Sequence, residues 1–506
     1  MEESTATVKE YGIPGRVLYG RRDIFSGVEE ITEENVISEV NSALVYHLQN
    51  VVEEEYLYWY RRGLQPILSR TKERNTIVLN KVVENHAEEI VAFKNGYFLM
   101  EPAKYISRRD SSARKVDKLN EYLYRSGKHI ADNVIADWFH MVGKAALYIE
   151  SNADDDIPVR CYALDPRSAF VVYSLRPGNE PLYAVNMVVG STEVSIDVYT
   201  KDKVFRLYGS SKSSEATNYP NRDAIATGVR AVEDNPLGNI PIIEYRYNSV
   251  NMGSFESVVY LLDAINNVQS NRIDGVEQFI QSIAVAVNCQ FEEGTTADQI
   301  RAAGMIALRS VGENKADFRI LSEELDQQQT QTLVDDLYDQ ALRICSMPTT
   351  TKGGRSTSDT GQAVIFRDGW EQAAASARNT EDLFKQSNRR FDEIFTSILR
   401  VKGLLDIKLI DFDLNFVRNE TAGVQSKAQA MQTMLAAGLH PEIALARSGI
   451  SNDPVADVKM SAPYLTMVWG DPKQADKVEK QTNGQGEAEI VETDDNNGEN
   501  VSGGSV

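Results

Sequence analysis

The sequence is poor in the residues that build disulfides, metal centres and membrane spans. Its 506 residues include three cysteines and five histidines. Cys161, Cys289 and Cys345 lie far apart without a CxxC spacing, which predicts unpaired, buried thiols in a reducing compartment. No apolar run approaches the roughly 18 residues of a membrane helix, and the N-terminus shows no signal-peptide pattern. We therefore expect a soluble cytoplasmic protein that has no membrane partner.

The motifs of common enzymes are also missing. The sequence has no GxxxxGK[ST] phosphate loop, no GxSxG elbow, and no HxxxH or HExxH spacing among its histidines. The stretch "NADDDIP" at 152–158 places Asp154, Asp155 and Asp156 side by side. Three adjacent carboxylates could bind Mg²⁺, but a solvated turn before a strand is the more common use of such a stretch. We expect no enzymatic activity, no metal and no cofactor.

Basic residues are outnumbered, with 53 Lys and Arg against 74 Asp and Glu and a formal net charge of −21. This balance disfavours a sequence-reading DNA-binding protein, because such proteins normally carry a basic stripe that displaces counterions. Solubility alone explains the acidity of most acidic proteins. A surface that must lie near nucleic acid without adhering to it is the second interpretation.

Hydrophobic residues make up 42% of the chain, enough for several cores, and the length predicts two to four domains. Apolar spacing and turn residues predict an α+β fold. Helices are expected over 33–62, 76–96, 114–150 (with a break near Gly127), 254–282, 328–345 and 421–447 (with a break at Gly438 and Pro441). Extended chain is expected after a turn at Asn95-Gly96, in a strand meander of about 90 residues from Pro158 with a loop at 209–235, in short pieces within 283–327 that also hold a helix at "TTADQIRAAGMI", and over 408–416.

Residues 359–402 have the pattern of a helix of more than 40 residues, closed by Gly403, with kinks expected at Gly361 and Gly369. A helix of roughly 60 Å normally needs neighbouring helices along its length, so we expect homo-oligomerisation. Before it lies "SMPTTTKGGRSTSDTGQAV" at 346–364, which carries Lys352 and Arg355 and is rich in Ser and Thr. Its composition suits a phosphate-binding loop, but the loop follows a helix instead of a strand, which disfavours nucleotide binding.

Several stretches occur in an order that is typical of one protein family. They are "YRRGLQPILSR" followed by "NKVVENHAEEIVAFKNGYFLMEP", then "ALDPRSAFVVY", "SDTGQAV" and "LNFVRNETAG". In this order they resemble the N-terminal pattern, the proline-marked strand pair, the start of the long helix and the strand with Arg-Asn of the portal proteins of tailed bacteriophages, siphophage type. The third motif departs from the family's Ser-Gly-x-Ala, because Asp359 and Thr360 separate Ser358 from Gly361. The resemblance covers about 30–465.

The resemblance implies a portal fold assembled as a ring, typically of twelve subunits. Carried onto this chain, its parts are an N-terminal arm at 1–30, a wing of helices and then a β meander at 31–253, stem helices at 254–282 and 328–345, a small α/β clip at 283–327, a tunnel loop at 346–358, a long wing helix and strand at 359–419, a helical crown at 420–470 and a disordered acidic tail at 471–506.

The resemblance also implies a function. Such a ring is the channel at one capsid vertex through which double-stranded DNA is packaged and ejected. The implied partners are other copies of the chain, the terminase motor, head-tail connector or adaptor proteins, major capsid and scaffolding proteins, and transiently the DNA. The implied location is the virion, after assembly in the host cytoplasm.

Individual residues receive roles from the same resemblance. The implied DNA contacts of the tunnel loop are Thr349, Thr350, Thr351, Lys352, Arg355 and Ser356. The implied motor- and connector-facing residues of the clip are Phe291, Glu292, Glu293 and Asp298, with Val285, Val287, Met305 and Ile306 expected in contacts between subunits.

Two interpretations from other classes stay open. An oligomeric nucleic-acid-processing scaffold in the cytoplasm could use the basic loop to hold single strands, although 346–358 has no aromatic residue on which bases could stack. An enzyme could use the carboxylates of 152–158 as a metal site. Loss of Asp154, Asp155 and Asp156 would abolish the activity of such an enzyme and would do little to a portal.

Overall fold

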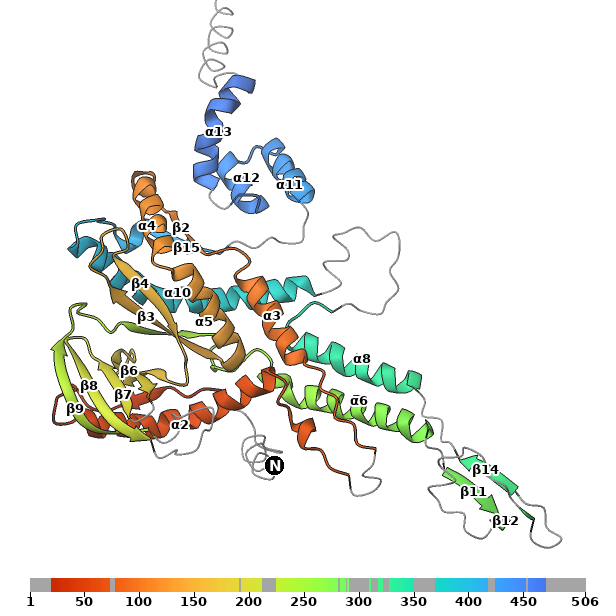
Figure 1. Ribbon diagram of the computed structural model, residues 1–506. Helices are drawn as coiled ribbons and strands as arrows, with labels where there is room; N and C mark the ends of the chain where they lie inside the picture. Colours follow the sequence, from red (N-terminus) through yellow and green to blue (C-terminus); the bar gives the residue numbers. More distant parts are fainter. Residues whose placement is uncertain are drawn as a thin grey trace, which may run out of the picture. The chain divides into compact units, whose positions relative to one another are not determined.

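A computed structural model of the chain describes residues 20–72, 78–190, 193–211, 224–280, 283–287, 289–290, 309–310, 317–321, 327–349, 369–416, 424–451 and 454–469. The chain divides into two compact units, Met1–Thr421 and Ala422–Val506. Helices and strands are both abundant, which confirms the predicted α+β class (Figure 1).

The first unit holds all the described strands and most of the helices. Its α-helices are α2 (Val36–Arg61), α3 (His86–Phe98), α4 (Ala113–Arg125), α5 (Lys128–Val142), α6 (Val259–Ile280), α8 (Gln327–Ile344) and α10 (Trp370–Val401). Its strands are β1 (Ile24–Ser26), β2 (Lys104–Ser107), β3 (Lys144–Ser151), β4 (Val159–Leu164), β5 (Ala169–Ser174), β6 (Pro181–Val189), β7 (Val194–Tyr199), β8 (Lys203–Ser211), β9 (Ala224–Asp234), β10 (Ile242–Arg246), β11 (Ile283–Val287), β12 (Cys289–Gln290), β13 (Arg309–Ser310), β14 (Asp317–Leu321) and β15 (Phe412–Asn415). The second unit contains α11 (Val424–Ala436), α12 (Pro441–Ser448) and α13 (Pro454–Trp469).

A six-stranded sheet in the order β1-β5-β6-β7-β8-β9 is covered on one face by α2 (Figure 1). Alternate residues of β7 are buried, as expected when one face of a strand meets a core. Strands β5 to β9 follow one another in this sheet and confirm the predicted meander, whereas β4 and β10, which also fall in the predicted stretch, belong to a second sheet. The predicted loop at 209–235 is wrong in part, because β8 runs to Ser211 and β9 occupies Ala224–Asp234.

A second, three-stranded sheet in the order β10-β3-β4 carries the largest core. Helices α4, α5 and α10 pack against it, and Phe384 and Phe391 of α10 are fully buried there. The small sheet of β2 and β15 joins the same core, since Tyr105 and Phe412 meet edge to face with ring centroids 4.9 Å apart. Residues far apart in the sequence thus share one core.

Two helix predictions are wrong in part. Helix α5 stops before Gly143, whose φ of +93° cannot continue a right-handed helix, so 144–150 of the predicted helix 114–150 belongs to β3 instead. The break near Gly127 is confirmed. Of the helix expected over 76–96, residues 78–85 are not helical, and α3 begins at His86. The predicted turn at Asn95-Gly96 is helical as well, because α3 runs on to Phe98.

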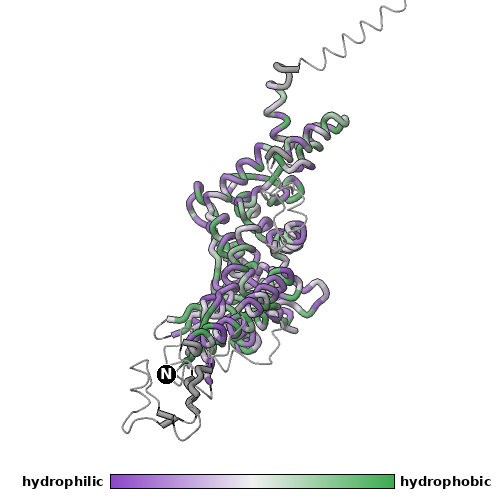
Figure 2. The backbone as a smooth tube through the Cα atoms, turned by 90° about the vertical axis from the view of Figure 1, so that its right-hand side faces the viewer, coloured by the Kyte–Doolittle hydropathy of each residue, from purple (hydrophilic) through white to green (hydrophobic). Residues whose placement is uncertain are grey.

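The other predicted elements agree better with the structure. The helices predicted over 33–62, 254–282, 328–345 and 421–447 are confirmed as α2, α6, α8 and the pair α11 and α12, and the strand at 408–416 as β15. Of the long helix predicted over 359–402, residues 370–401 are confirmed as α10, which has 32 residues, and Gly369, where a kink was expected, has a φ of +82°. Residues 359–368 lie outside the described residues. Gly361 and the predicted helix of 283–327 lie outside the described residues. Within the described part of the chain, no helix combines the length and the apolarity needed to cross a membrane (Figure 2).

Two glycines allow backbone segments to cross between α5 and the start of α6. A Cβ atom on Gly143 would lie 2.1 Å from the carbonyl oxygen of Asn251, and one on Gly253 would lie 2.2 Å from that of Met141. Real Cβ contacts are never so short, so only glycine permits these crossings. The close approach places Ser254 within hydrogen-bonding distance of the end of α5, its N–H donating to the His140 carbonyl at 2.6 Å.

Candidate functional site at the root of the 350–368 loop

Helices α6 and α8 lie side by side and run in opposite directions (Figure 1). Arg272, late in α6, donates to Gln331, early in α8, at 2.5 Å. At the other end, the Cys345 thiol after α8 donates to the Ser254 carbonyl before α6 at 3.4 Å. Apolar residues of both helices join one core with α3 and the second half of α2; they include Val259, Leu262, Ile265, Val334, Ala341 and Leu342. We call this helix pair the stem, and its Cys345 end the stem base.

Residues 78–85, here called the strap, fasten α3 to the stem through a ladder of hydrogen bonds. Three buried polar side chains of α6 accept from alternate strap amides: Asn266 from Glu84 at 2.8 Å, Ser270 from Val82 at 2.9 Å and Asp274 from Asn80 at 2.7 Å. Four helical residues rise about 6 Å, and two extended residues about 6.6 Å, so the two spacings match. This match explains why the strap is extended.

The strap ladder was missed at the sequence level, although a signal exists. Asn266, Ser270 and Asp274 recur every four residues and therefore form one polar line along α6. On an amphipathic helix such as α6, a line of polar residues is normally expected to face solvent. Here all three side chains are almost fully buried, because the strap covers them.

The chain leaves the stem base toward residues 350–368, which lie outside the described part of the chain, through a tightly turned segment. Ser346 has a φ of +52°, an uncommon conformation for a residue other than glycine, and the amide of Met347 donates to the Leu342 carbonyl at 2.9 Å. The Met347 side chain is buried in the stem core. Lys94 of α3 reaches this turn, and its Nζ donates to the Ser346 carbonyl at 3.3 Å. Burial lowers the pKa of Lys94 from its usual range to about 8.

The chain returns from the loop next to the point where it left. A Cβ atom on Gly369 would lie 3.8 Å from the Met347 carbonyl oxygen. Trp370, the first residue of α10, then packs against two rings of α3, with centroids 6.0 Å from those of both Phe93 and Tyr97. Both ends of the loop thus meet α3, one through Lys94 and the other through Trp370.

The structure places one of the ten predicted site residues. Thr349 is the last described residue at the stem base, and it is only 6% exposed. Thr350, Thr351, Lys352, Arg355 and Ser356 lie outside the described residues, as do Phe291, Glu292, Glu293 and Asp298. Of the predicted contacts between subunits, Val285 and Val287 lie in β11, which pairs with β14, and Met305 and Ile306 are outside the described part. The roles of all these residues stay predictions.

A buried ion-pair group joins the chain before β1 to the start of the stem. The Arg21 side chain is fully buried and contacts Glu256, just before α6, at 2.6 Å and Glu53 of α2 at 3.0 Å. Arg21 also donates to the Val142 carbonyl at the end of α5, at 3.1 Å. Breaking a buried pair of this kind is costly because the remaining charge loses its partner. The group therefore connects the start of the stem to the chain before β1, to α2 and to the end of α5.

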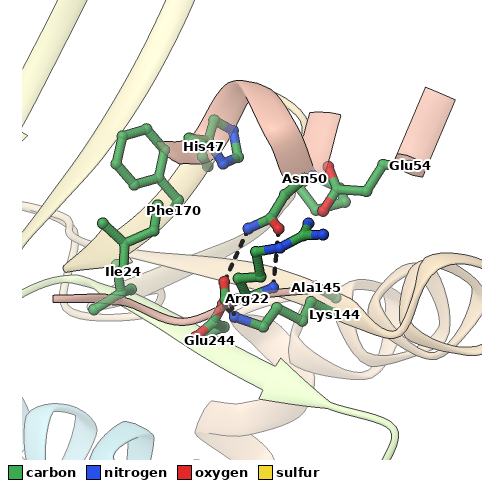
Figure 3. Close-up of a pocket in the computed structure, with 12 residues that line it drawn as sticks. Arg22, Ile24, His47, Asn50, Glu54, Lys144, Ala145, Phe170 and Glu244 are labelled. Atoms are coloured by element: carbon green, nitrogen blue, oxygen red, sulfur yellow. Dashed lines mark hydrogen bonds and ion pairs between the residues drawn. The ribbon is translucent and has the colours of Figure 1, made fainter. Parts of the chain in front are cut away.

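A cavity of about 10 Å³ lies next to this group, and Figure 3 shows its lining. His47, Asn50 and Glu54 of α2 all line this cavity; Asn50 reaches Arg22, whereas the His47 ring stacks on Phe170 with ring centroids 4.2 Å apart. Asn50 exchanges two hydrogen bonds of 2.9 Å with the backbone of Arg22. The cavity is about the size that one buried water needs. Within the described part of the chain, Glu54 Oε2 and His47 Nδ1 have no hydrogen-bond partner.

Burial changes the ionisation of both of these groups. It raises the pKa of Glu54 from 4.5 to about 7 and lowers the pKa of His47 from 6.5 to about 4. The cause is the same in both cases, since a dry site disfavours whichever form carries charge. The cavity is structural in character, and nothing in it resembles a catalytic pair.

The carboxylates of 152–158 form a solvated turn, as the preferred interpretation predicted. Asp154, Asp155 and Asp156 are exposed, and the amide of Asp156 donates to Asp154 Oδ1 at 2.9 Å, as in an Asx turn. Their cationic neighbours are Lys402, 3.4 Å from Asp155, and Arg125, 3.7 Å from Asp156. Among the residues that the structure describes, no cluster of three or more His, Cys, Asp or Glu could hold a metal ion. Cys161 and Cys345 are buried free thiols, as expected.

Comparison with known proteins gives one match. A family model described as "Phage portal protein, SPP1 Gp6-like" matches residues 47–481, more than four fifths of the chain. The match includes α3, the strap, the stem, the 350–368 loop and α10. No curated protein matches the sequence.

Proposed function

Because this chain belongs to the phage portal protein family, we propose that copies of it form a ring of about twelve subunits at one vertex of a bacteriophage capsid. Double-stranded DNA is packaged and later ejected through the central channel of this ring. The observation that carries the proposal is the antiparallel stem of α6 and α8, with the 350–368 loop rooted at its base and α10 directly after it. The family is one of structural, non-enzymatic proteins.

In this proposal the stem helices face the channel and the tunnel loop at 346–358 touches the passing DNA. Lys352 and Arg355 can neutralise phosphates, while Thr350, Thr351 and Ser356 can donate to phosphate oxygens. Affinity for DNA grows steeply with the number of phosphates neutralised, so two cations per subunit hold the duplex only weakly. The net charge of −21 on each subunit opposes adhesion elsewhere. The combination suits a channel that DNA must traverse without being trapped.

The segment between the stem helices, 283–327, is proposed as the clip. Phe291, Glu292, Glu293 and Asp298 would face the terminase motor during packaging and the head-tail connector proteins afterwards. The second unit would form the crown, on the side of the capsid interior where scaffolding and major capsid proteins assemble. The protein would be assembled in the host cytoplasm and end in the virion.

Negative-stain electron microscopy of the purified protein at moderate salt tests the ring. Rings with a central hole and twelve- or thirteen-fold symmetry are expected. Filaments or compact particles under every assembly condition would overturn the proposal and favour the scaffold interpretation.

A DNA-packaging assay then tests the loop. The double variant K352A/R355A is expected to form rings but to package DNA several-fold more slowly, because it lacks both proposed phosphate contacts. The matched control is R160A/K201A, which removes the same two charge types from exposed positions of the wing. Equal packaging by both double variants would contradict a DNA-contacting role for the loop cations.

A further inference from the structure

We propose that Lys94 is a positioning residue at the stem base: it holds the carbonyl of Ser346 where the chain leaves the stem, and thereby sets the direction in which the chain departs toward the predicted tunnel loop. The inference rests on the proposed function, since it assigns a task to Lys94 only if the loop meets DNA.

The first support is the position of Lys94 in α3. Phe93, Lys94 and Tyr97 lie on adjacent turns of one helix and meet both ends of the loop, since the two rings pack on Trp370 and the amine bonds to Ser346. Helix α3 is itself held by its contacts with α5, α6 and α10 and by the strap that precedes it. Both ends of the segment are therefore held by contacts with the same helix, α3.

The second support is chemical. Lys94 is only 7% exposed, and the Ser346 carbonyl is its one hydrogen-bond acceptor among the described residues. Taking an ammonium group out of water is unfavourable, and a single carbonyl compensates for little of that loss. An apolar side chain of similar length would fill the same space without the cost of burying a charge. Lys94 thus contributes a directed hydrogen bond at a position where packing alone favours Leu or Met.

The third support is that the surroundings leave Lys94 directed at the loop. Its charge acts on the buried Cys345 thiol at the stem base and on His140 of α5, whose pKa it helps to lower after the larger effect of burial. Carboxylates of α3, α5 and α6 are engaged with other groups: Asp137 of α5 with Arg61 and Asn95, Glu88 with Arg61, Glu89 with His86 and Tyr338 of α8, and Asp263 of α6 with Tyr60. None of these carboxylates is bonded to Lys94.

The consequence is a link between the ionisation of Lys94 and the loop exit. A charged donor makes a hydrogen bond roughly twice as strong as a neutral one. Lys94 is mostly charged at neutral pH and loses its proton as the pH rises through about 8. The hold on Ser346 therefore weakens between about pH 7 and pH 9.

Hydrogen–deuterium exchange on the assembled full-length protein tests the proposal without any activity assay. The reporter amides are those of Cys345, Ser346 and Met347, which all donate to carbonyls of α8. In K94M at pH 7 they are expected to exchange about tenfold faster than in the wild type, as for the loss of one charged hydrogen bond. Thermal stability is expected to stay equal or rise. After correction for intrinsic exchange, the wild-type amides lose protection from pH 7 to pH 9, whereas K94M gives a flat profile.

The matched control is K115M, because Lys115 of α4 also donates to one backbone carbonyl, that of Asp406 at 2.8 Å, but is exposed and lies outside the strap, α3 and the stem. It is expected to leave the three reporter amides unchanged. Unaltered exchange in K94M would overturn the proposal. So would faster exchange that extends equally to the β6, β7 and β8 amides, because that result means general destabilisation.

A packaging assay completes the test and separates the two proposals. If K352A/R355A and K94M both slow packaging while rings still form, the loop contacts DNA and Lys94 positions it. If K352A/R355A packages normally, the DNA-contacting role fails, and the exchange experiment still decides whether Lys94 holds Ser346. If K352A/R355A is slow but K94M packages at the wild-type rate, the positioning role of Lys94 is wrong.

Discussion

At the scale of single residues, Gly253 decides whether the stem can join the wing. The substitution G253A would place a Cβ atom 2.2 Å from the Met141 carbonyl oxygen, so a backbone segment must move. We expect G253A to lower the free energy of unfolding by about 1–3 kcal/mol, the usual range for forced overpacking. Thermal melting followed by circular dichroism measures the change.

The control for G253A is another glycine substitution. Gly96 lies inside α3 with nothing within 4 Å of a Cβ position, so G96A is expected to leave stability equal or raise it by roughly 0.5–1 kcal/mol. Indistinguishable melting curves for G253A and the wild type would contradict the close crossing.

Glu54 is a second residue whose surroundings predict a measurable effect. Its pKa in the folded protein is about 7 instead of 4.5, so the unfolded chain releases this proton first as the pH rises. The stability associated with protonated Glu54 is fully present below about pH 4.5 and is lost as the pH rises through about 7. At about 1.4 kcal/mol per pKa unit, the shift of Glu54 from 4.5 to about 7 corresponds to a loss of roughly 3 kcal/mol.

The variant E54Q removes this titration. It is expected to match the wild type near pH 4.5 and to be up to about 3 kcal/mol more stable at pH 8, as measured by denaturant unfolding across pH. The control is E33Q, at an exposed glutamate ahead of the same helix, which should follow the wild-type profile. Parallel pH profiles for E54Q and the wild type would show that Glu54 is ionised normally.

At the scale of elements, the strap shows how tertiary structure overrides local pattern. The apolar spacing of 76–96 suits one helix, yet the strap amides bond to α6 side chains instead of to their own chain. Periodicity describes which residues face a core, but it does not reveal that a buried line of Asn, Ser and Asp on another helix offers competing acceptors. The same ladder gives a direct test.

Asn266 and Asn267 are neighbours of identical chemistry with opposite surroundings. Asn266 is fully buried and accepts from the Glu84 amide, whereas Asn267 is exposed. We expect N266A to cost about 1–3 kcal/mol, because it leaves a buried amide without a partner. N267A should change stability by no more than about 0.5 kcal/mol. Urea unfolding of both variants measures the difference, and equal midpoints would show that the strap does not depend on the ladder.

At the scale of the whole molecule, the exposed carboxylates distinguish a portal from an enzyme. The triple variant D154N/D155N/D156N is expected to assemble and to package DNA at the wild-type rate. Its two surface ion pairs, with Lys402 and Arg125, contribute at most about 1 kcal/mol each. Ring formation and packaging measure the outcome. Loss of function in a variant that still assembles would instead support a metal site at 152–158.

The sequence by itself determined the α+β class, the amphipathic pair of the stem, the long α10 and membership of the portal family. These features depend on the periodicity of apolar residues and on the order of motifs, both of which can be read from the sequence without knowledge of tertiary contacts. Only the tertiary structure decided the extended strap, the strand after Gly143, the start of α10 at Trp370 and the hydrogen bond from Lys94 to the Ser346 carbonyl. Each of these depends on a partner that lies at least 100 residues away or on a backbone angle, and composition encodes neither. The features that only the structure decided involve buried polar atoms or backbone angles, and the partner of a buried polar atom depends on which distant segment the fold brings next to it.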